Sequence, residues 1–168
     1  MSERPQILFA SDRPDRRWVG GKTAALAALG EEGWSVPPWF AVTVAAFEQA
    51  FDPEDLEALR NCQDPDRIEE LFQKIRPHPD LPSQIQNALG AISPGGEPVA
   101  VRSSAVEEDG TGHSFAGQLE SFLFVGHEQV LEKIKAVWRS AFSPRVIAYR
   151  AERGLSGGPS VPAVLVLA

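Results

Sequence analysis

Two glycines followed by a lysine, Gly20-Gly21-Lys22, form the first pattern in the sequence that could bind a phosphate. Glycines at the start of a helix let backbone N–H groups approach an anion, and an adjacent lysine adds a point charge. With Thr23, the run matches the end of a P-loop, but that motif needs a glycine at position 16, where Arg16 stands. We therefore reject the P-loop. Taken alone, the tetrapeptide is more typical of a flexible helix cap with a solvated lysine.

A second pattern, the run Val101–Ser104, places Arg102 next to the hydroxyl groups of Ser103 and Ser104. An arginine at the end of a buried strand is held rigidly, and its planar guanidinium matches phosphate oxygens. The serines would add hydroxyl donors. The alternative is an ordinary ion pair between Arg102 and the acidic run at residues 107–109. The residues alone leave both interpretations open.

The run Ser114–Gln118 sets small residues around an aromatic one, as in a loop that closes over a ligand. Its candidates for ligand contact are Ser114, Gly117 and Gln118. The competing interpretation is a tight turn with Phe115 in the core, which the pattern alone favours.

Metal sites and nucleophilic sites find little support in the sequence. The three histidines, His78, His113 and His127, lack the spacing of a metal site or of a nucleophile with its base. The acidic run at residues 107–109 could bind a cation, but such a run is more typical of a solvated surface. Cys62 is the single cysteine, which excludes an internal disulfide and a cysteine-based metal cluster.

Several strands and helices must position these residues. Apolar, β-rich runs predict strands at Ile7–Ala10, Phe40–Val44, Val99–Arg102, Phe122–Val125 and Val161–Leu167. Alanine-rich sequence predicts a helix from Gly20 to Leu29. The middle of the chain, residues 51–96, reads as helical, and Ser83 is expected to cap its third helix. Strands and helices that mix without a regular βαβ order predict an α+β fold.

Composition narrows the class of protein further. The chain has 168 residues, of which 43% are hydrophobic and 23% charged, as expected for one globular domain with its own core. A net charge of −7 argues against nucleic-acid binding. No apolar run is long enough to span a bilayer, and the N-terminal residues lack the apolar core of a signal peptide. The cytoplasm is therefore the expected location.

The order of these patterns resembles the N-terminal ATP-binding domain of phosphoenolpyruvate synthases and pyruvate phosphate dikinases. The matching segments are Val19–Lys22, Val36–Pro38 with Phe40 and Thr43, Val99–Ala105 with Glu108 and Asp109, Ser114–Gln118, and Phe142–Arg150. The resemblance covers residues 7–50 and 97–168, while residues 51–96 match in outline only. We therefore expect residues 1–168 to form the N-terminal part of such a domain, with an insert-like helical middle.

The resemblance implies an ATP-grasp-type nucleotide site. In that family, the lysine after the double glycine and the arginine of the Val-Arg-Ser-Ser motif contact ATP phosphates, and these positions are Lys22 and Arg102 here. We expect both side chains to face one cavity. The full set of expected ATP-binding residues is Lys22, Arg102, Gly20, Gly21, Ser103, Ser104, Ser114, Gly117 and Gln118. The implied cofactors are ATP and Mg²⁺, with the metal ligands outside this chain.

The implied reaction passes a phosphoryl group from ATP to a histidine on a mobile domain, which carries it to pyruvate in a separate barrel domain. Those domains and the nucleotide are the expected partners; nucleic acid and membrane are not. Because the chain ends at Ala168 inside an apolar run, we expect it to be a fragment of such an enzyme. Because it shows no convincing set of metal ligands, we expect it to be inactive alone. A non-catalytic module with the same fold, or a related dikinase for an antibiotic or a glucan, is the alternative. Trp18, Thr23 and Trp39 depart from the family's usual residues.

Overall fold

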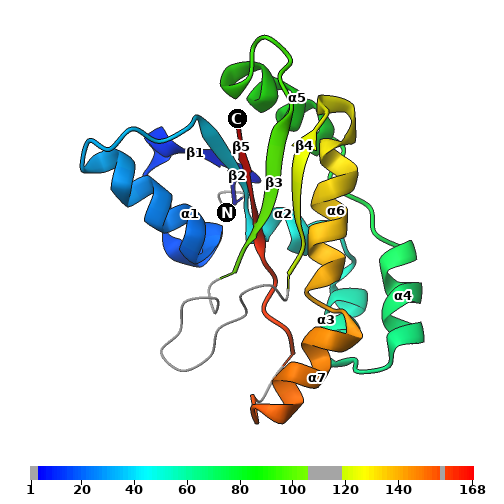
Figure 1. Ribbon diagram of the computed structural model, residues 1–168. Coiled ribbons are helices and arrows are strands. Elements are labelled where there is room, and N and C mark those ends of the chain that lie inside the picture. Colours follow the sequence, from blue (N-terminus) through cyan, green and yellow to red (C-terminus); the bar gives the residue numbers. More distant parts are fainter. Residues whose placement is uncertain (1–3, 106–118, 156–157) are drawn as a thin grey trace.

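In the computed structural model, one antiparallel sheet forms the centre of the molecule (Figure 1). The structure describes residues 4–105, 119–155 and 158–168. Neighbouring strands are hydrogen-bonded in the order β1-β2-β5-β3-β4, and every pair is antiparallel. The α+β class is therefore confirmed. The strands are β1 (Ile7–Phe9), β2 (Trp39–Val42), β3 (Val99–Ser104), β4 (Ser121–Val125) and β5 (Ala163–Leu167).

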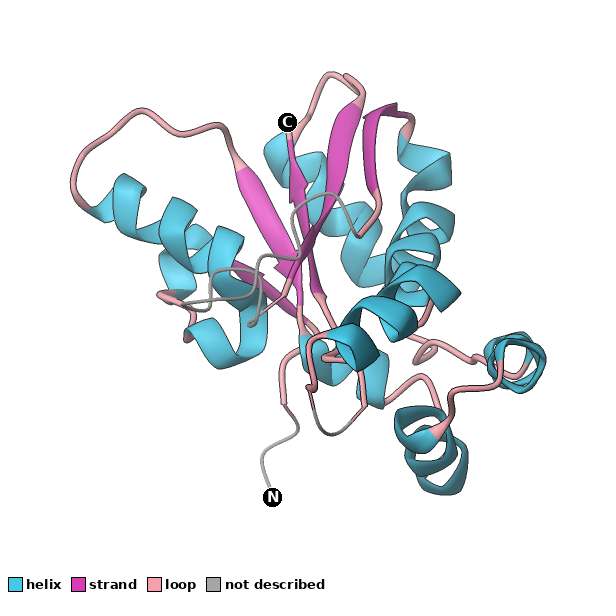
Figure 2. Ribbon diagram, turned by 60° about the horizontal axis from the view of Figure 1, so that its bottom comes forward, coloured by secondary structure: helices cyan, strands magenta, loops and turns pink. Residues whose placement is uncertain are grey.

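Helix α1 lies on one face of this sheet, and the helices that follow β2 gather on the other (Figures 1 and 2). The α-helices are α1 (Arg16–Glu31), α2 (Val44–Glu48), α3 (Pro53–Asn61), α4 (Pro65–Gln73), α5 (Leu81–Ile92), α6 (Val130–Ser140) and α7 (Pro144–Glu152). Two short 3₁₀ turns, η1 (Ala10–Asp12) and η3 (His127–Gln129), complete the described elements.

Prolines in the first turn mark where several helices start. Helices α3, α4, α5 and α7 each have a proline at the first or second position, where its missing N–H leaves no helical bond unmade. The predicted cap at Ser83 is wrong. Helix α5 begins earlier, at Leu81, and the Ser83 hydroxyl donates a hydrogen bond to the Asp80 carbonyl at 2.8 Å.

The alternation of side chains along the strands creates two separate cores. In β2, Phe40 and Val42 face the large core under α2–α6, while Trp39 and Ala41 pack with α1. Both faces of the central strands are thus covered. A shift of one residue in the strand register would exchange these two sets, so the register is fixed by both cores.

The centre of the large core is Phe47, which lies on α2. Its fully buried ring lies 5.0–6.4 Å, centroid to centroid, from four other aromatic rings: Phe51, Phe72, Trp138 and Phe142. The sequence patterns did not predict α2; they extended the preceding strand to Val44, which is instead the first residue of this helix. A short helix missed by periodicity therefore supplies the central core residue.

We predict that Phe47→Ala lowers the free energy of unfolding by about 3–5 kcal/mol, because it opens a cavity that its ring neighbours cannot fill. Urea denaturation followed by tryptophan fluorescence measures the loss. Phe124→Ala is the matched control. Phe124 is 86% exposed at a bulge in β4, so its removal should change stability by less than about 0.5 kcal/mol. Similar losses in both variants would contradict the assignment of the core.

Candidate functional site

Helix α1 is interrupted one turn after it begins. Asp15 caps the first turn by accepting a hydrogen bond from the Arg17 N–H at 2.8 Å. The side-chain hydrogen bond from Arg17, together with that backbone bond, lowers the pKa of Asp15 to about 2. At Gly20 the backbone leaves the helical region, with φ 76° and ψ 176°, which in practice only glycine adopts. The uninterrupted part of the helix therefore starts at the glycine pair, as predicted.

The interruption brings the backbone of α1 against the end of β3. A Cβ atom on Gly20 would lie 1.8 Å from the Ser104 carbonyl oxygen, so no other residue fits there. The Gly21 N–H donates a hydrogen bond to the Ala105 carbonyl at 3.0 Å. That N–H is therefore engaged within the chain, and what both glycines provide in the structure is close approach between backbones.

The two serines of β3 are both buried. The Ser104 hydroxyl lies against α1, where it contacts the Val19 carbonyl at 2.6 Å and both the N–H and the hydroxyl of Thr23 at 3.1 Å. Ser103 is 1% exposed and lies on the opposite side of the strand, toward the large core. Neither hydroxyl reaches the surface of the described structure, and the Ser104 hydroxyl joins the end of β3 to α1.

Lys22 and Arg102 lie on the same side of β3. The ammonium group of Lys22, which is half-buried, donates a hydrogen bond to the Ser103 carbonyl at 3.3 Å. Arg102 is exposed and shares a strand face with Ser104, whose side chain contacts α1. The fold thus brings two cationic side chains that are distant along the chain to one side of β3.

The alternative of an ion pair for Arg102 finds no support among the described residues, since none of their carboxylates lies within 4.0 Å of its guanidinium. The acidic run at residues 107–109 lies outside the described residues, and so do Ser114, Gly117 and Gln118. Within the described part of the chain, no group of three or more histidine, cysteine or carboxylate side chains could hold a metal ion.

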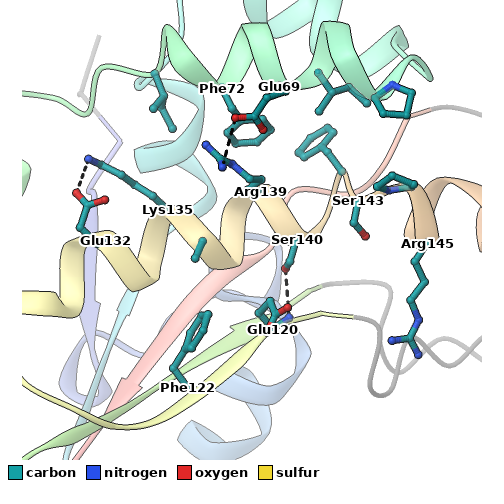
Figure 3. A pocket seen from close by; sticks show the side chains of 16 residues that line it. Glu69, Phe72, Glu120, Phe122, Glu132, Lys135, Arg139, Ser140, Ser143 and Arg145 are labelled. Carbon is teal, nitrogen blue, oxygen red and sulfur yellow. Dashed lines mark hydrogen bonds and ion pairs between the residues drawn. The ribbon is translucent and has the colours of Figure 1, made fainter.

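The expected common cavity for Lys22 and Arg102 stays a prediction, and the described structure places both side chains on one side of β3. A hollow of about 700 Å³ lies among α4, α6 and β4 (Figure 3). Phe72 and Phe122 contribute to its apolar lining, and Arg139 at its rim lies 3.5 Å from Glu69. It is on the face of the sheet opposite α1. Lys22 and Arg102 lie on the α1 side of β3.

Two further residues near the site were underestimated from sequence. Thr23 stood out only as a departure from the family pattern, yet its N–H and its hydroxyl both donate hydrogen bonds to the Ser104 hydroxyl. Trp39, another departure, is 3% exposed and packs between the sheet and α1. Two hydroxyl residues 81 positions apart carry no local signal, so only the fold could join them.

Comparison with known proteins identifies the family to which this chain belongs. The family model described as "Pyruvate phosphate dikinase, AMP/ATP-binding domain" matches residues 16–168. With the antiparallel sheet and the helices on its two faces, that match is consistent with an α+β nucleotide-binding domain. The chain belongs to the pyruvate phosphate dikinase AMP/ATP-binding family.

Three relatives illustrate the range of this family. The prodigiosin synthesizing transferase PigC of Serratia marcescens is 34% identical over 132 residues, covering 78% of this chain and 15% of that protein. The phosphoenolpyruvate synthase of Aeropyrum pernix is 34% identical over 168 residues, covering 88% and 20%. The rifampicin phosphotransferase of Bacillus subtilis is 34% identical over 163 residues, covering 88% and 19%. The chain thus spans a fifth or less of the length of each.

We predict that Gly20→Ala destabilises the chain by at least about 1–3 kcal/mol, the cost of a side chain in this backbone region, with the clash at Ser104 adding to it. Chemical denaturation measures the change. Gly90→Ala, at an exposed position in the last turn of α5 where the new Cβ would meet no neighbouring element within 4 Å, should instead leave stability unchanged or raise it by up to about 0.5–1 kcal/mol. If Gly20→Ala were neutral, the tight junction between α1 and β3 would be refuted.

Proposed function

We propose that the junction of α1 and β3 binds the phosphates of ATP, with Lys22 and Arg102 as the contacting cations. The family match to an AMP/ATP-binding domain supports the ligand. The observation that carries the site is the exposed guanidinium of Arg102, which has no ion pair among the described residues and shares a strand side with Lys22. An arginine fork suits phosphate oxygens, and a lysine supplies a point charge.

The remaining residues of the proposed set divide into two roles. Gly20, Gly21 and Ser104 hold α1 against β3, and Ser103 supplies the carbonyl that receives Lys22. Ser114, Gly117 and Gln118 complete the phosphate site in this proposal. We further propose that the site is of ATP-grasp type, and that residues 1–168 form the N-terminal part of the domain, with residues 51–96 as a helical, insert-like middle.

Magnesium belongs to the same proposal, but the described residues do not fit a magnesium site. They contain no cluster of carboxylates that could bind the ion, so we propose that its ligands lie outside this chain and assign no step to it. Lys22 and Arg102 would neutralise phosphate charge directly. In phosphoryl transfer, such charge neutralisation and positioning supply most of the catalysis.

For the whole protein, we propose an ATP-dependent phosphotransferase that passes a phosphoryl group through a histidine to pyruvate. Several relatives are named phosphoenolpyruvate synthase, which supports this acceptor. The histidine domain and the pyruvate domain would be its partners within one polypeptide, in the cytoplasm. None of the helices in the described part of the chain has the length and apolarity required to span a bilayer.

An antibiotic acceptor is the second candidate. Relatives named rifampicin phosphotransferase match this chain about as well, at 34% and 36% identity. Relatives with both names match the same region of this chain. Residues at the α1–β3 junction therefore do not select the acceptor in this proposal. Assay of the whole protein with pyruvate and with rifampicin, each with ATP, distinguishes the two candidates.

We predict that Arg102→Lys in the whole protein raises the dissociation constant for ATP roughly 10- to 150-fold, since a lysine keeps the charge but loses the two-pronged hydrogen bond. Arg102→Ala should cost at least as much. Calorimetric titration with ATP measures both. Arg67→Lys is the control, because Arg67 makes a surface pair with Glu70 on α4, on the other side of the sheet. Wild-type affinity in Arg102→Lys would make Arg102 a structural residue.

We also predict that the purified chain of 168 residues does not turn over ATP. The described residues hold no metal-ligand group, and the three relatives above extend over at least five times the length that matches here. The measurements are phosphate release and phosphohistidine formation, compared with a heat-inactivated sample. Turnover above that background would show that this chain carries a complete catalytic site.

A further inference from the structure

We propose that Thr23 is a positioning residue, which acts with Ser104 to fix the interruption of α1 and so the place of Lys22. The inference rests on the proposed function only where it assigns Lys22 to ATP. The buried contact itself is independent of any ligand. Thr23, Ser104 and Val19 are each 0% exposed, so water cannot substitute for a lost hydrogen bond among them.

The Ser104 hydroxyl replaces a hydrogen bond of the helix. In an unbroken α-helix the Thr23 N–H would donate to the Val19 carbonyl four residues earlier. Here the Ser104 oxygen lies between these two groups, accepting from the Thr23 N–H at 3.1 Å and donating to the Val19 carbonyl at 2.6 Å. A side chain inserted into the helical ladder is a recognised cause of a sharp kink. The kink at Gly20 lies inside the turn that Ser104 bridges.

The hydroxyl of Thr23 completes this arrangement. A serine hydroxyl has one hydrogen to donate and two lone pairs to accept. Because the Ser104 hydrogen goes to Val19 and one lone pair takes the Thr23 N–H, the Thr23 hydroxyl, 3.1 Å away, must donate to the second lone pair. All three bonding positions of Ser104 are then filled, and each has one possible direction.

Lys22 is held by this arrangement because it lies within the bridged turn. The Gly21 N–H donates to the carbonyl of Ala105, the residue after β3, and the Thr23 N–H donates to the Ser104 hydroxyl. The Lys22 ammonium donates to the Ser103 carbonyl. The lysine is thus fixed on both sides along the chain. Removal of the Thr23 hydroxyl should loosen the turn without changing any charge at the site.

The test compares Thr23→Val with Thr23→Ser, because valine keeps the shape but lacks the hydroxyl, whereas serine retains it. Thr43→Val is the matched control. Thr43 is also fully buried, and its hydroxyl donates a single hydrogen bond to the Pro5 carbonyl at 2.7 Å, away from Lys22. Ser104→Ala is avoided as the main variant because it removes three hydrogen bonds at once and endangers folding.

The first measurement is amide hydrogen exchange at Gly21 and Lys22, which needs no ligand. In Thr23→Val we expect about tenfold faster exchange at these amides, because the turn opens locally more often. Thr23→Ser and Thr43→Val should remain within about twofold of wild type. The second measurement is ATP titration of the whole protein, where Thr23→Val should raise the dissociation constant roughly fivefold and Thr43→Val should leave it unchanged.

Equal exchange at Gly21 in Thr23→Val and in wild type overturns the proposal, since the hydroxyl would then have no effect on the turn. Faster exchange with unchanged ATP affinity also overturns it, because the turn would not position the ligand contact. Failure of the proposed function has a different signature. In that case the wild-type protein itself does not bind ATP, while the exchange difference between the two threonine variants persists.

Discussion

The exchange of one helical hydrogen bond for two bonds to a serine hydroxyl is the interaction on which the candidate site depends. Ser104 separates the Val19 carbonyl from the Thr23 N–H and thereby joins α1 to the end of β3. The kink at Gly20 allows the backbones to approach, and the covered face of the sheet keeps water away from the contact. The position of Lys22 follows from this junction. Arg102 reaches the same side through strand alternation alone.

Sequence patterns predicted the parts of this site that have a local signal. The glycine pair was predicted to start a helix and lies where α1 is interrupted, and the apolar run at Val99 marked the strand that carries Arg102. The orientation of the serines was not predictable in the same way. An isolated strand exposes alternate residues, but β3 is covered at its end by α1 on one face and by the large core on the other, so Ser103 and Ser104 are both buried. Such two-sided burial is a property of the assembled fold.

Short-range patterns also failed where tertiary packing decides the local structure. The run Val44–Glu48 lacks the length for a clear helical period, and its aromatic and β-branched residues suit a strand equally well. It forms a helix because Phe47 then enters a cluster of aromatic rings from two distant regions of the chain, Phe72 on α4 and Trp138 with Phe142 at α6. Trp39 illustrates the same limit. In the sequence it is only a departure from the family's usual residue, whereas in the structure it fills the core beneath α1.

The candidate site lies on the α1 face of the sheet, whereas most of the other helices pack on the opposite face. The residues that build the junction come from two segments 81 to 85 positions apart, whereas the helices between those segments pack into the opposite core. Insertions, deletions and substitutions in residues 51–96 can therefore accumulate without displacing the junction. The junction and the helical layer are free to evolve at different rates.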